Sequence, residues 1–285
     1  MQICRTIPEM RAVRASLGAD IGYVATMGGL HAGHMALVAA ARARSAPTVA
    51  SIFVNPTQFE NPADLSDYPA DTDRDLAMLE AGGVAAVFLP GVQDIYPEGA
   101  ETIVEPTRLA NMLHGEVRLG HFRGVATVVA KLFHIIAPQR AYFGKKDYQQ
   151  LAVIRQMVRD LHMPVEIAAV ETVREEDGLA LSSRNGRLSE AERAAAPVLY
   201  RALQEAASAL QVGRRAPHGP ITIENAKDVA RARLAGETLA RLERIDIVDP
   251  ESFAPLRGAV TGQVGMMISA HVGETLLLDQ LEATI

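Results

Sequence analysis

The sequence predicts an α/β fold in which a parallel-sheet domain is followed by a smaller α+β domain. From residue 21 to residue 170, short apolar runs alternate with amphipathic stretches, which is the pattern of a parallel sheet covered by helices on both faces. Beyond residue 172 this alternation stops, and the chain ends in strand-like runs joined by a tight turn. We therefore expect one domain over residues 1–172 and a second over residues 173–285.

The first domain is expected to be Rossmann-like, with strands and helices in strict alternation. Each expected strand is a short apolar run, and the second is rich in β-branched residues; the strands are placed at residues 21–25, 48–54, 84–89, 141–143 and 165–170. Helices are expected at residues 33–44, 71–81, 125–136 and 147–162. The run 125–136 is apolar nearly all round, which indicates a buried helix, and in the last helix Leu151, Ile154, Val158 and Leu161 recur at helical spacing.

The second domain is expected to begin with helices and to end in antiparallel strands. Ser189 and Glu192 form a capping-box pattern before an alanine-rich helix, and Pro197 predicts a kink or a shorter helix. A loop at 213–220 and a helix at 221–234 follow. Strands are expected at 242–248, 266–272 and 275–281, with the turn between the last two at Gly273 and Glu274.

Composition limits the classes of function. The 28 Lys and Arg residues against 34 Asp and Glu residues give a net charge of −6, which disfavours a protein that grips nucleic-acid backbone. Cys4 is the only cysteine, so an intrachain disulfide is excluded and a cysteine-based metal site is disfavoured. We see no signal-peptide pattern and no apolar run near the roughly 18 residues of a membrane span. We expect a cytoplasmic protein that binds neither nucleic acid nor membrane.

Two histidines stand at the expected start of the first helix, in TMGGLHAGH. The N–H groups and the positive dipole end of such a helix attract phosphate, and imidazoles can donate hydrogen bonds to charge on a transferring phosphoryl group. Gly33 allows a ligand to approach closely, and Gly28 and Gly29 allow a tight turn. Zinc is disfavoured, because a third ligand and the glutamate of HExxH are missing. By themselves, His31 and His34 fit either a phosphate site or two ordinary histidines near a turn.

Two further polar segments follow expected strands. FVNPTQF brings Asn55 and Gln58 to a strand end, where ligands of open parallel sheets bind, although Asn-Pro is also a common turn opener. In GKKDYQQ, a lysine could balance a triphosphate, while Asp147 could cap the helix, hold a ribose hydroxyl or reach a magnesium ion. Gln150 lies close enough to face the same cleft. Taken by itself, the second segment is better explained by a solvated loop with a capping aspartate.

Two segments offer anion-binding side chains. LSSRN presents Ser182, Ser183 and Arg184, whose hydroxyl and guanidinium groups suit phosphate oxygens; a plain polar loop is the alternative. GHFRGV places Arg123 at the start of the buried helix, where anion contact and simple helix entry are equally plausible.

Taken in order, these segments resemble the pantothenate synthetase (pantoate–β-alanine ligase) family. The resemblance rests on TMGGLHAGH, FVNPTQF, GHFRGV, FGKKDYQQ, VREEDGLALSSRN and MMISAHVGETLLLD. It covers almost the whole chain and is weakest between residues 205 and 240. The HxGH element is shared with the wider nucleotidylyltransferase superfamily, whereas FVNPTQF, GHFRGV and KDYQQ are specific to this family.

The resemblance implies an ATP-dependent condensation of (R)-pantoate with β-alanine to pantothenate, a coenzyme A precursor. A pantoyl adenylate forms on the way, and AMP and pyrophosphate are released. The resemblance also implies Mg²⁺ with the ATP, a homodimer, and a second domain that closes as a lid.

The resemblance assigns site residues one by one, and it leaves the metal ligands unassigned. The expected catalytic residues are His34, as proton donor, His31 and Lys146. The expected ATP-binding residues are Met27, Gly28, Gly33, Gly144, Lys145, Lys146, Asp147, Val173, Leu181, Ser182, Ser183 and Arg184. The expected substrate-binding residues are Gln58, Gln150, Met27, Asn55 and Arg123.

The sequence departs from the family pattern at four places. Ala25 replaces a usual proline, which is expected to loosen the pantoate wall and raise the Michaelis constant. Lys145 replaces an acidic residue or glutamine and is expected to point outward. Residues 68–71 read YPAD where relatives have YPRT, and His271 replaces a usual arginine.

Two rival functions are less consistent with these residues than the ligase. A nucleotidylyltransferase acting on a phosphorylated substrate would need basic residues for the substrate phosphate, whereas Gln58 and Gln150 are neutral. A non-catalytic nucleotide-binding module is disfavoured because the histidines, Lys146 and the Ser-Ser-Arg loop occur together.

Overall fold

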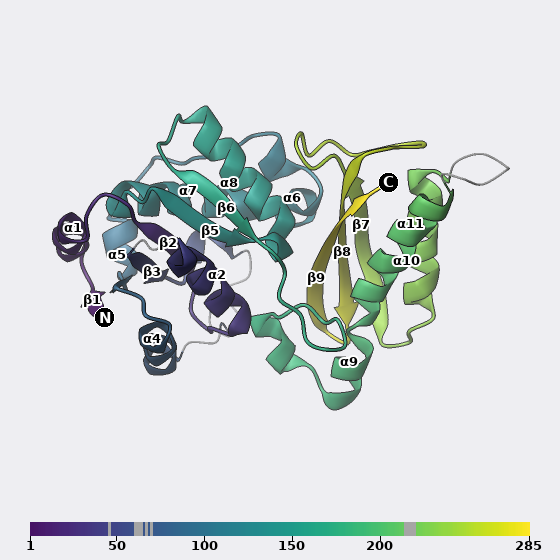
Figure 1. The fold of residues 1–285 in the computed structure, drawn as a ribbon, viewed down its shortest axis with the longest axis horizontal. Helices are drawn as coiled ribbons and strands as arrows, with labels where there is room; N and C mark the ends of the chain where they lie inside the picture. Colours follow the sequence, from purple (N-terminus) through teal and green to yellow (C-terminus); the bar gives the residue numbers. More distant parts are fainter. Residues whose placement is uncertain (45–46, 60–64, 66–67, 69–70, 214–220) are drawn as a thin grey trace. The chain divides into compact units, whose positions relative to one another are not determined.

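The computed structural model describes residues 1–44, 47–59, 65, 68, 71–213 and 221–285. The chain forms two compact units (Figure 1). The first unit comprises Met1–Lys145 and Gln149–Glu171, and the second comprises Lys146–Tyr148 and Thr172–Ile285. Each unit has its own sheet and its own apolar core, so each is described by itself.

The first unit is built on a six-stranded sheet whose order is β1-β4-β3-β2-β5-β6. Every pairing in it is parallel, which confirms the predicted parallel sheet. The strands are β1 (Gln2–Cys4), β2 (Gly22–Thr26), β3 (Thr48–Ile52), β4 (Ala86–Phe88), β5 (Arg140–Gly144) and β6 (Glu166–Val170). The chain proceeds outward from β2 to β4 and then returns to the other side of β2 with β5. Such a switch point is where open α/β sheets bind ligands.

Helices cover both faces of this sheet, as predicted. They are α1 (Ile7–Ser16), α2 (Ala32–Ala43), α4 (Thr72–Ala81), α5 (Val92–Ile95), α6 (His114–Val117), α7 (His121–Ile136) and α8 (Tyr148–Asp160), joined by the 3₁₀ turns η1 (Pro56–Gln58), η2 (Leu109–Asn111) and η3 (Lys145–Asp147). Val24 packs into a core cluster with Val38 of α2, whereas the Tyr23 ring meets the Phe133 ring of α7 at 6.2 Å. Successive residues of a strand point to opposite faces, so α2 and α7 lie on opposite faces.

The predicted strands and helices of the first unit are present, but the short helices α5 and α6 and the 3₁₀ turns were not predicted, and further details differ. β1 and α1 were not predicted, although Thr6 and Glu9 form a capping box at the start of α1. α7 begins at His121 rather than at residue 125, because Gly120, at φ 75°, precedes the first turn. Leu161 was expected to continue the helical spacing of α8, but the helix ends at Asp160 and Leu161 is 49% exposed.

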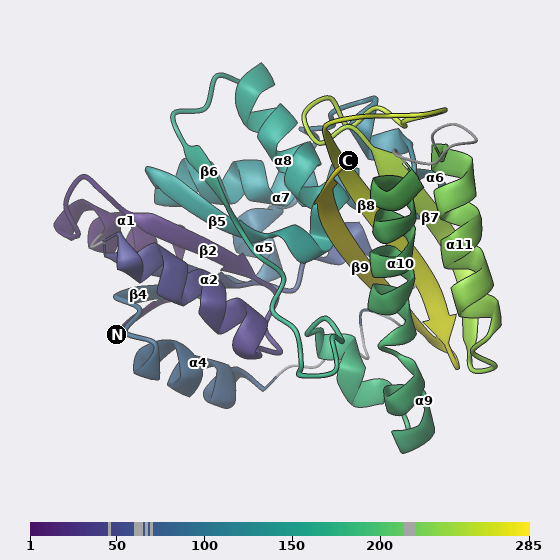
Figure 2. The ribbon, with the colours of Figure 1, turned by 45° about the vertical axis from the view of Figure 1, so that its right-hand side comes forward.

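The second unit is a three-stranded antiparallel sheet packed against helices. Its elements are η4 (Ser183–Arg187), α9 (Glu190–Ala195), α10 (Val198–Gly213), α11 (Ile223–Ala235), β7 (Ala240–Val248), β8 (Gln263–Val272) and β9 (Thr275–Thr284). Helices α10 and α11 lie side by side against the sheet (Figure 2), and apolar residues such as Leu203, Ala230 and Met266 form the core between them. The predicted Ser189 capping box is present, and the helix stops short of Pro197 as expected. Of the predicted loop at 213–220, Gly213 is helical and the rest lies outside the described residues.

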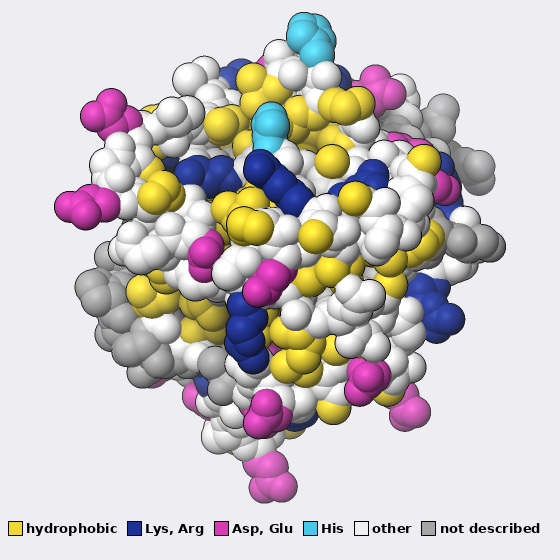
Figure 3. All heavy atoms as spheres, turned by 90° about the vertical axis from the view of Figure 1, so that its left-hand side faces the viewer, with side chains coloured by type: hydrophobic (Ala, Val, Ile, Leu, Met, Phe, Trp, Pro, Cys, Tyr) yellow, Lys and Arg dark blue, Asp and Glu magenta, His cyan; other side chains and the backbone are white. Residues whose placement is uncertain are grey.

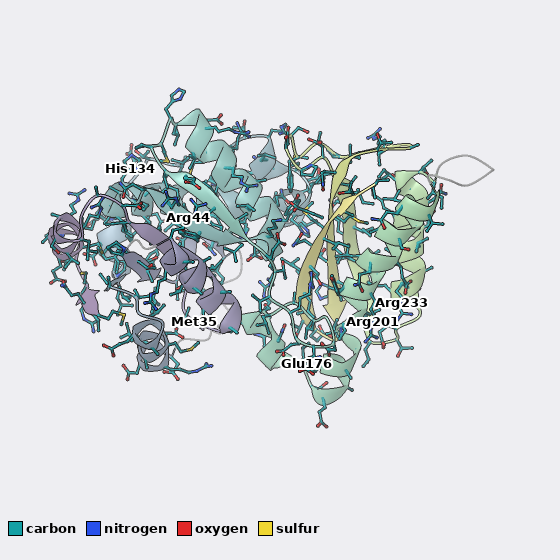
Figure 4. All side chains as sticks on the ribbon, viewed as in Figure 1. Met35, Arg44, His134, Glu176, Arg201 and Arg233 are labelled. Atoms are coloured by element: carbon teal, nitrogen blue, oxygen red, sulfur yellow. The ribbon has the colours of Figure 1, made fainter. Side chains whose placement is uncertain are left out.

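The amino ends of β5 and β6 carry an ion-pair network. The Arg140 guanidinium lies 2.8 Å from Glu166 and 3.2 Å from Asp20, and Arg44, labelled in Figure 4, lies 3.2 Å from Glu166. Each such surface pair stabilises the fold by about 0–1 kcal/mol.

On the face drawn in Figure 3, acidic, basic and apolar side chains are interspersed. Among the described residues, every helix is too short or too polar to span a lipid bilayer.

Candidate active site

A double-glycine turn connects β2 to α2 in the first unit. Gly28 and Gly29 have φ values of 86° and 63°, a region that residues with a Cβ rarely adopt. The Gly28 N–H donates to the Thr26 hydroxyl at 3.3 Å, and that hydroxyl donates to the Ser51 carbonyl at 2.7 Å. The turn is therefore tied to the carboxyl ends of two neighbouring strands.

The two histidines cap the helix that follows this turn. His31 is the N-cap of α2, and its Nδ1 accepts from the Gly33 N–H at 3.1 Å. His34 reaches back, and its Nδ1 accepts from the His31 N–H at 3.3 Å, with the ring centroids 4.2 Å apart. Because each Nδ1 is an acceptor, the neutral rings carry their proton on Nε2, which is a donor. The predicted location of the pair at a helix start is confirmed.

Gln58 meets Met27 at the same edge of the sheet. The Gln58 Nε2 lies 2.9 Å from the Met27 sulfur, and its Oε1 accepts from Asn55 Nδ2 at 3.0 Å. Gln58 is the last residue of η1, the next element after β3. The side chains from FVNPTQF and TMGGLHAGH therefore come together, as expected for adjacent strand ends.

Asn55 is buried behind Gln58 with both ends of its amide engaged. Besides holding Gln58, its Nδ2 donates to the Gly124 carbonyl at 3.2 Å. Its Oδ1 accepts from the Thr57 and Tyr96 hydroxyls, each at 2.9 Å. Burial raises the pKa of Tyr96, and the Thr57 hydrogen bond opposes that rise, so the Tyr96 hydroxyl stays protonated as a donor.

Helix α7 approaches η1 so closely that only a glycine fits at position 124. A Cβ there would lie 2.5 Å from the Thr57 carbonyl oxygen and 2.9 Å from the Gln58 nitrogen. One turn earlier, the His121 ring contacts the Gln58 carbonyl at 2.9 Å. Arg123 lies on the exposed side of the same helix. Sequence reasoning assigned a role to Arg123 but missed His121 and Gly124.

The adjacent glutamines of KKDYQQ have different environments. Gln149 is buried and holds the segment before α7: its Nε2 donates to the Leu109 and Met112 carbonyls at 2.9 and 2.7 Å, and its Oε1 accepts from the His114 N–H at 3.0 Å. Gln150 is only partly buried. The packing therefore separates a structural glutamine from one that solvent reaches.

The lysines of this segment also differ from each other. Lys145, at the carboxyl end of β5 after Gly144, is partly buried and forms an ion pair with Glu171, which is exposed, and its expected outward direction stays a prediction. Lys146 belongs to the second unit, where its Nζ lies 3.3 Å from the Asp147 carboxylate.

The other expected nucleotide-binding residues lie in the second unit. The Leu181 N–H donates to the Val173 carbonyl at 2.9 Å. Ser182 caps η4 by accepting from the Arg184 N–H at 3.2 Å, and Ser183 is the first residue of η4. The Arg184 guanidinium donates to the Leu276 carbonyl at 3.4 Å. The polar loop is thus an ordered capped turn.

A buried ion pair supports the base of this loop. Arg174 donates to both carboxylate oxygens of Asp279 at 2.7 and 2.8 Å, and its guanidinium stacks 3.6 Å from the Tyr200 ring centroid. Burial raises the pKa of Asp279, and Arg174 opposes that rise. Nothing in the local sequence had singled out this pair.

Sequence reasoning also missed Asp75, a buried carboxylate on α4. Its oxygens accept from the Gly29 and Leu30 N–H groups, both at 2.8 Å. No three His, Cys, Asp or Glu side chains are grouped to hold a metal ion in the described part of the chain.

The fold and the site together define a class: a Rossmann-like α/β protein with helix-capping histidines and amide side chains at the carboxyl ends of its central strands. The chain belongs to the pantoate–β-alanine ligase family, whose model, described as Pantoate-beta-alanine ligase, matches residues 2–282. This confirms the family indicated by the order of the motifs.

Individual relatives match over nearly the full chain. A pantothenate synthetase from Herpetosiphon aurantiacus is 48% identical over 283 residues, covering 99% of each chain. The crystal structure of pantothenate synthetase from Thermus thermophilus matches with a TM-score of 0.91 and 46% identity, covering 100% of both chains. A pantoate-beta-alanine ligase from Francisella tularensis, solved in complex with beta-gamma ATP and beta-alanine, matches with a TM-score of 0.78 and 33% identity, covering 99% of this chain and 97% of that one.

Proposed function

We propose that this chain catalyses the ATP-dependent condensation of (R)-pantoate with β-alanine to pantothenate. First, a pantoate carboxylate oxygen bonds to the α-phosphorus of ATP as the bond from that phosphorus to the bridging oxygen breaks, which releases pyrophosphate. Then the β-alanine nitrogen bonds to the carbonyl carbon of the pantoyl adenylate, the bond to AMP breaks, and the nitrogen loses a proton. Neither step needs a protein nucleophile, so the site supplies alignment, charge neutralisation and shielding from water.

The observation that carries this proposal is the pair of capping histidines in a chain of this family. Their Nδ1 atoms are occupied by backbone N–H groups, so Nε2 is the donor for phosphate oxygens. His34 donates to the oxygens on which charge develops as pyrophosphate leaves, and His31 supports the same phosphates. Met27, Gly28 and Gly33 let the nucleotide lie close to the backbone.

The nucleotide contacts proposed in the second unit follow from the chemistry of its side chains. Lys146, Ser182, Ser183 and Arg184 offer ammonium, hydroxyl and guanidinium donors to the phosphates. Val173 and Leu181 supply backbone contacts near the adenine, and Asp147 contacts the ribose or the metal. In the first unit, the family resemblance assigns Gly144 and Lys145, at the end of β5, to nucleotide binding. The same resemblance implies that residues 173–285 act as a lid.

Pantoate is assigned to Gln58, which is buried beside Met27 and Asn55, and to Gln150, which is partly buried. Gln58 and Gln150 offer neutral donors and acceptors to its hydroxyl and carboxylate groups, which disfavours a phosphorylated substrate. Asn55 is engaged at both ends, so we assign it the positioning of Gln58 rather than direct contact. Arg123 remains a proposed anion contact. The effect of Ala25, which lies in β2 opposite Ser51, remains a prediction.

Mg²⁺ is proposed to accompany ATP. Nucleotide sites hold this ion with one or two carboxylates, phosphate oxygens and water. Asp147 offers one such carboxylate, 3.3 Å from the Lys146 ammonium group. The ion would neutralise phosphate charge when bound.

We also propose a cytoplasmic homodimer, in line with the family resemblance. Light scattering after size exclusion tests the assembly: a mass near 30.6 kDa, that of one chain, would refute the dimer.

The decisive assay follows AMP and pyrophosphate with pantoate present, with and without β-alanine. We expect pyrophosphate release to require pantoate and AMP release to require both substrates. Pyrophosphate release that is indifferent to pantoate across a range of acids would show that the substrate assignment is wrong. Transfer of AMP to a phosphorylated substrate, with no AMP released on adding β-alanine, would favour the nucleotidylyltransferase alternative.

A further inference from the structure

The turn that carries the capping histidines is held by a carboxylate from a distant segment. Asp75 is 1% exposed, and its two oxygens accept from two successive backbone N–H groups, those of Gly29 and Leu30, at 2.8 Å each. Successive N–H groups that point the same way form an anion-binding concavity. Here a side chain of the protein itself occupies that concavity.

The hydrogen bonds of Asp75 are continuous with those of the histidines. Three successive N–H groups each donate to a side chain. Those of Gly29 and Leu30 donate to Asp75, and that of His31 donates to His34 Nδ1. The Gly33 N–H donates in turn to His31 Nδ1. The direction in which the backbone enters the N-cap therefore depends on Asp75, and the ring orientations depend on that direction.

The two glycines of the turn increase the dependence of its conformation on Asp75. Gly28 is at φ +86°, and a Cβ added to it would lie 3.0 Å from the Asp75 carboxylate. A turn with two glycines in the left-handed region is conformationally free when untethered. The carboxylate selects one arrangement of the turn, and an amide could not, because only one of its two terminal atoms accepts hydrogen bonds.

We infer that Asp75 is a positioning residue for adenylate formation, acting through the turn that orients His31 and His34. The inference rests on the proposed function and adds a residue that never touches substrate. It assigns Asp75 to the first half-reaction, in which the histidines act on the phosphates, and not to the attack of β-alanine on the adenylate.

The test is Asp75→Asn in the full-length protein, with the half-reactions measured separately. We expect pantoate-dependent ATP–pyrophosphate exchange without β-alanine to fall by about 10²-fold, the effect of misplacing a reacting group by about 1 Å. The rate at which supplied pantoyl adenylate and β-alanine form pantothenate should stay within about twofold of wild type. In this half-reaction pyrophosphate has already left, so the histidines no longer act on its phosphates. Equal losses in both half-reactions would overturn the inference.

The matched control is Asp73→Asn. Asp73 lies in the same first turn of α4 but is exposed, so its substitution removes the same charge from the same helix end without touching the glycine turn. Exchange should remain at the wild-type rate. An equal loss in this control would show that the charge on α4, and not the tether, is responsible.

A mutant cycle separates positioning from general destabilisation. In a background that carries both His31→Ala and His34→Ala, adding Asp75→Asn should slow the remaining exchange by no more than about threefold, because both groups that it positions are gone. An additive loss would overturn the inference. If Asp75→Asn does not fold, Thr26→Val loosens the same turn at the Gly28 N–H, and unchanged exchange in that variant would likewise overturn it. Absence of exchange in the wild-type protein would overturn the proposed function, and this inference with it.

Discussion

Substitution of Gly124 tests how precisely α7 must approach the turn that carries Gln58. An added Cβ would lie 2.5 Å from the Thr57 carbonyl oxygen, 2.7 Å from its carbonyl carbon and 2.9 Å from the Gln58 nitrogen, whereas ordinary contact begins at 3.4 Å. All three atoms belong to the backbone, so no side-chain rotation relieves the clash. In Gly124→Ala, helix and turn must separate by about 1 Å, and overpacking of this kind costs about 1–3 kcal/mol of stability.

The same displacement should appear in catalysis. Gln58 is the proposed pantoate residue, and a shift of about 1 Å in a positioned group can cost about 10²-fold in rate. We expect the kcat/KM for pantoate to fall by up to about 10²-fold, while the KM for ATP stays near the wild-type value. Steady-state kinetics with varied pantoate at saturating ATP and β-alanine measure the loss in catalysis, and urea unfolding measures the loss in stability.

Gly236→Ala is the matched control for this substitution. Gly236 lies at the end of α11 with φ −76°, and an added Cβ would meet its nearest neighbour at 3.4 Å, an ordinary contact. Its kinetics should equal those of wild type. A folded Gly124→Ala protein with wild-type stability and an unchanged kcat/KM for pantoate would refute the reasoning.

Three further predictions concern the histidine pair and the second unit. His34→Ala should lower turnover by about 10²-fold or more while ATP binding, measured by calorimetry, persists; unchanged turnover would remove this residue from the mechanism. Arg174→Gln should lower the free energy of unfolding in urea by about 3–5 kcal/mol, because it strands the buried carboxylate of Asp279. Adding Asp279→Asn should recover part of that loss, and no recovery would contradict the explanation. The Arg193 hydrogen bond lowers the pKa of Asp177, so the ionised carboxylate stabilises the fold above the unfolded pKa of about 3.9, and this contribution disappears as the pH falls through the lowered value. Wild type should therefore lose stability more steeply than Asp177→Asn between about pH 5 and pH 2, by less than about 1 kcal/mol for so exposed a pair; parallel acid-denaturation curves would contradict this.

Local patterns in the sequence accounted for most of the elements. The strands from β2 to β6 were recognisable because each is a short apolar run, and Ser189 marked the start of α9 because a capping box acts within one helical turn. β1 was not predicted because its residues, Gln2–Cys4, form no apolar run and the strand is defined by its distant pairing, with Ile3 opposite Val87. An element that exists through a long-range partner leaves a weak local signal.

In the candidate site, too, the features that depend on nearby residues were predictable, and those that depend on packing were not. His31 and His34 could be placed at a helix start from the sequence, because the periodicity of α2 and the preceding glycines are local features. Gln149 and Gln150 are neighbours with the same side chain, and no local rule distinguishes them. Only the packing of Gln149 against the segment before α7 decides which one is structural.

The sequence by itself determined the alternation of strands and helices, the capped helix starts, and the family through the order of its motifs. These depend on interactions within a few residues, or on residue types that chemistry requires at set spacings. The tertiary structure alone decided that Asp75, rather than its neighbour Asp73, holds the histidine turn, and that Asn55 is anchored to Gly124 of α7. These roles depend on hydrogen bonds between segments far apart in the chain, which form only once folding has brought the segments together.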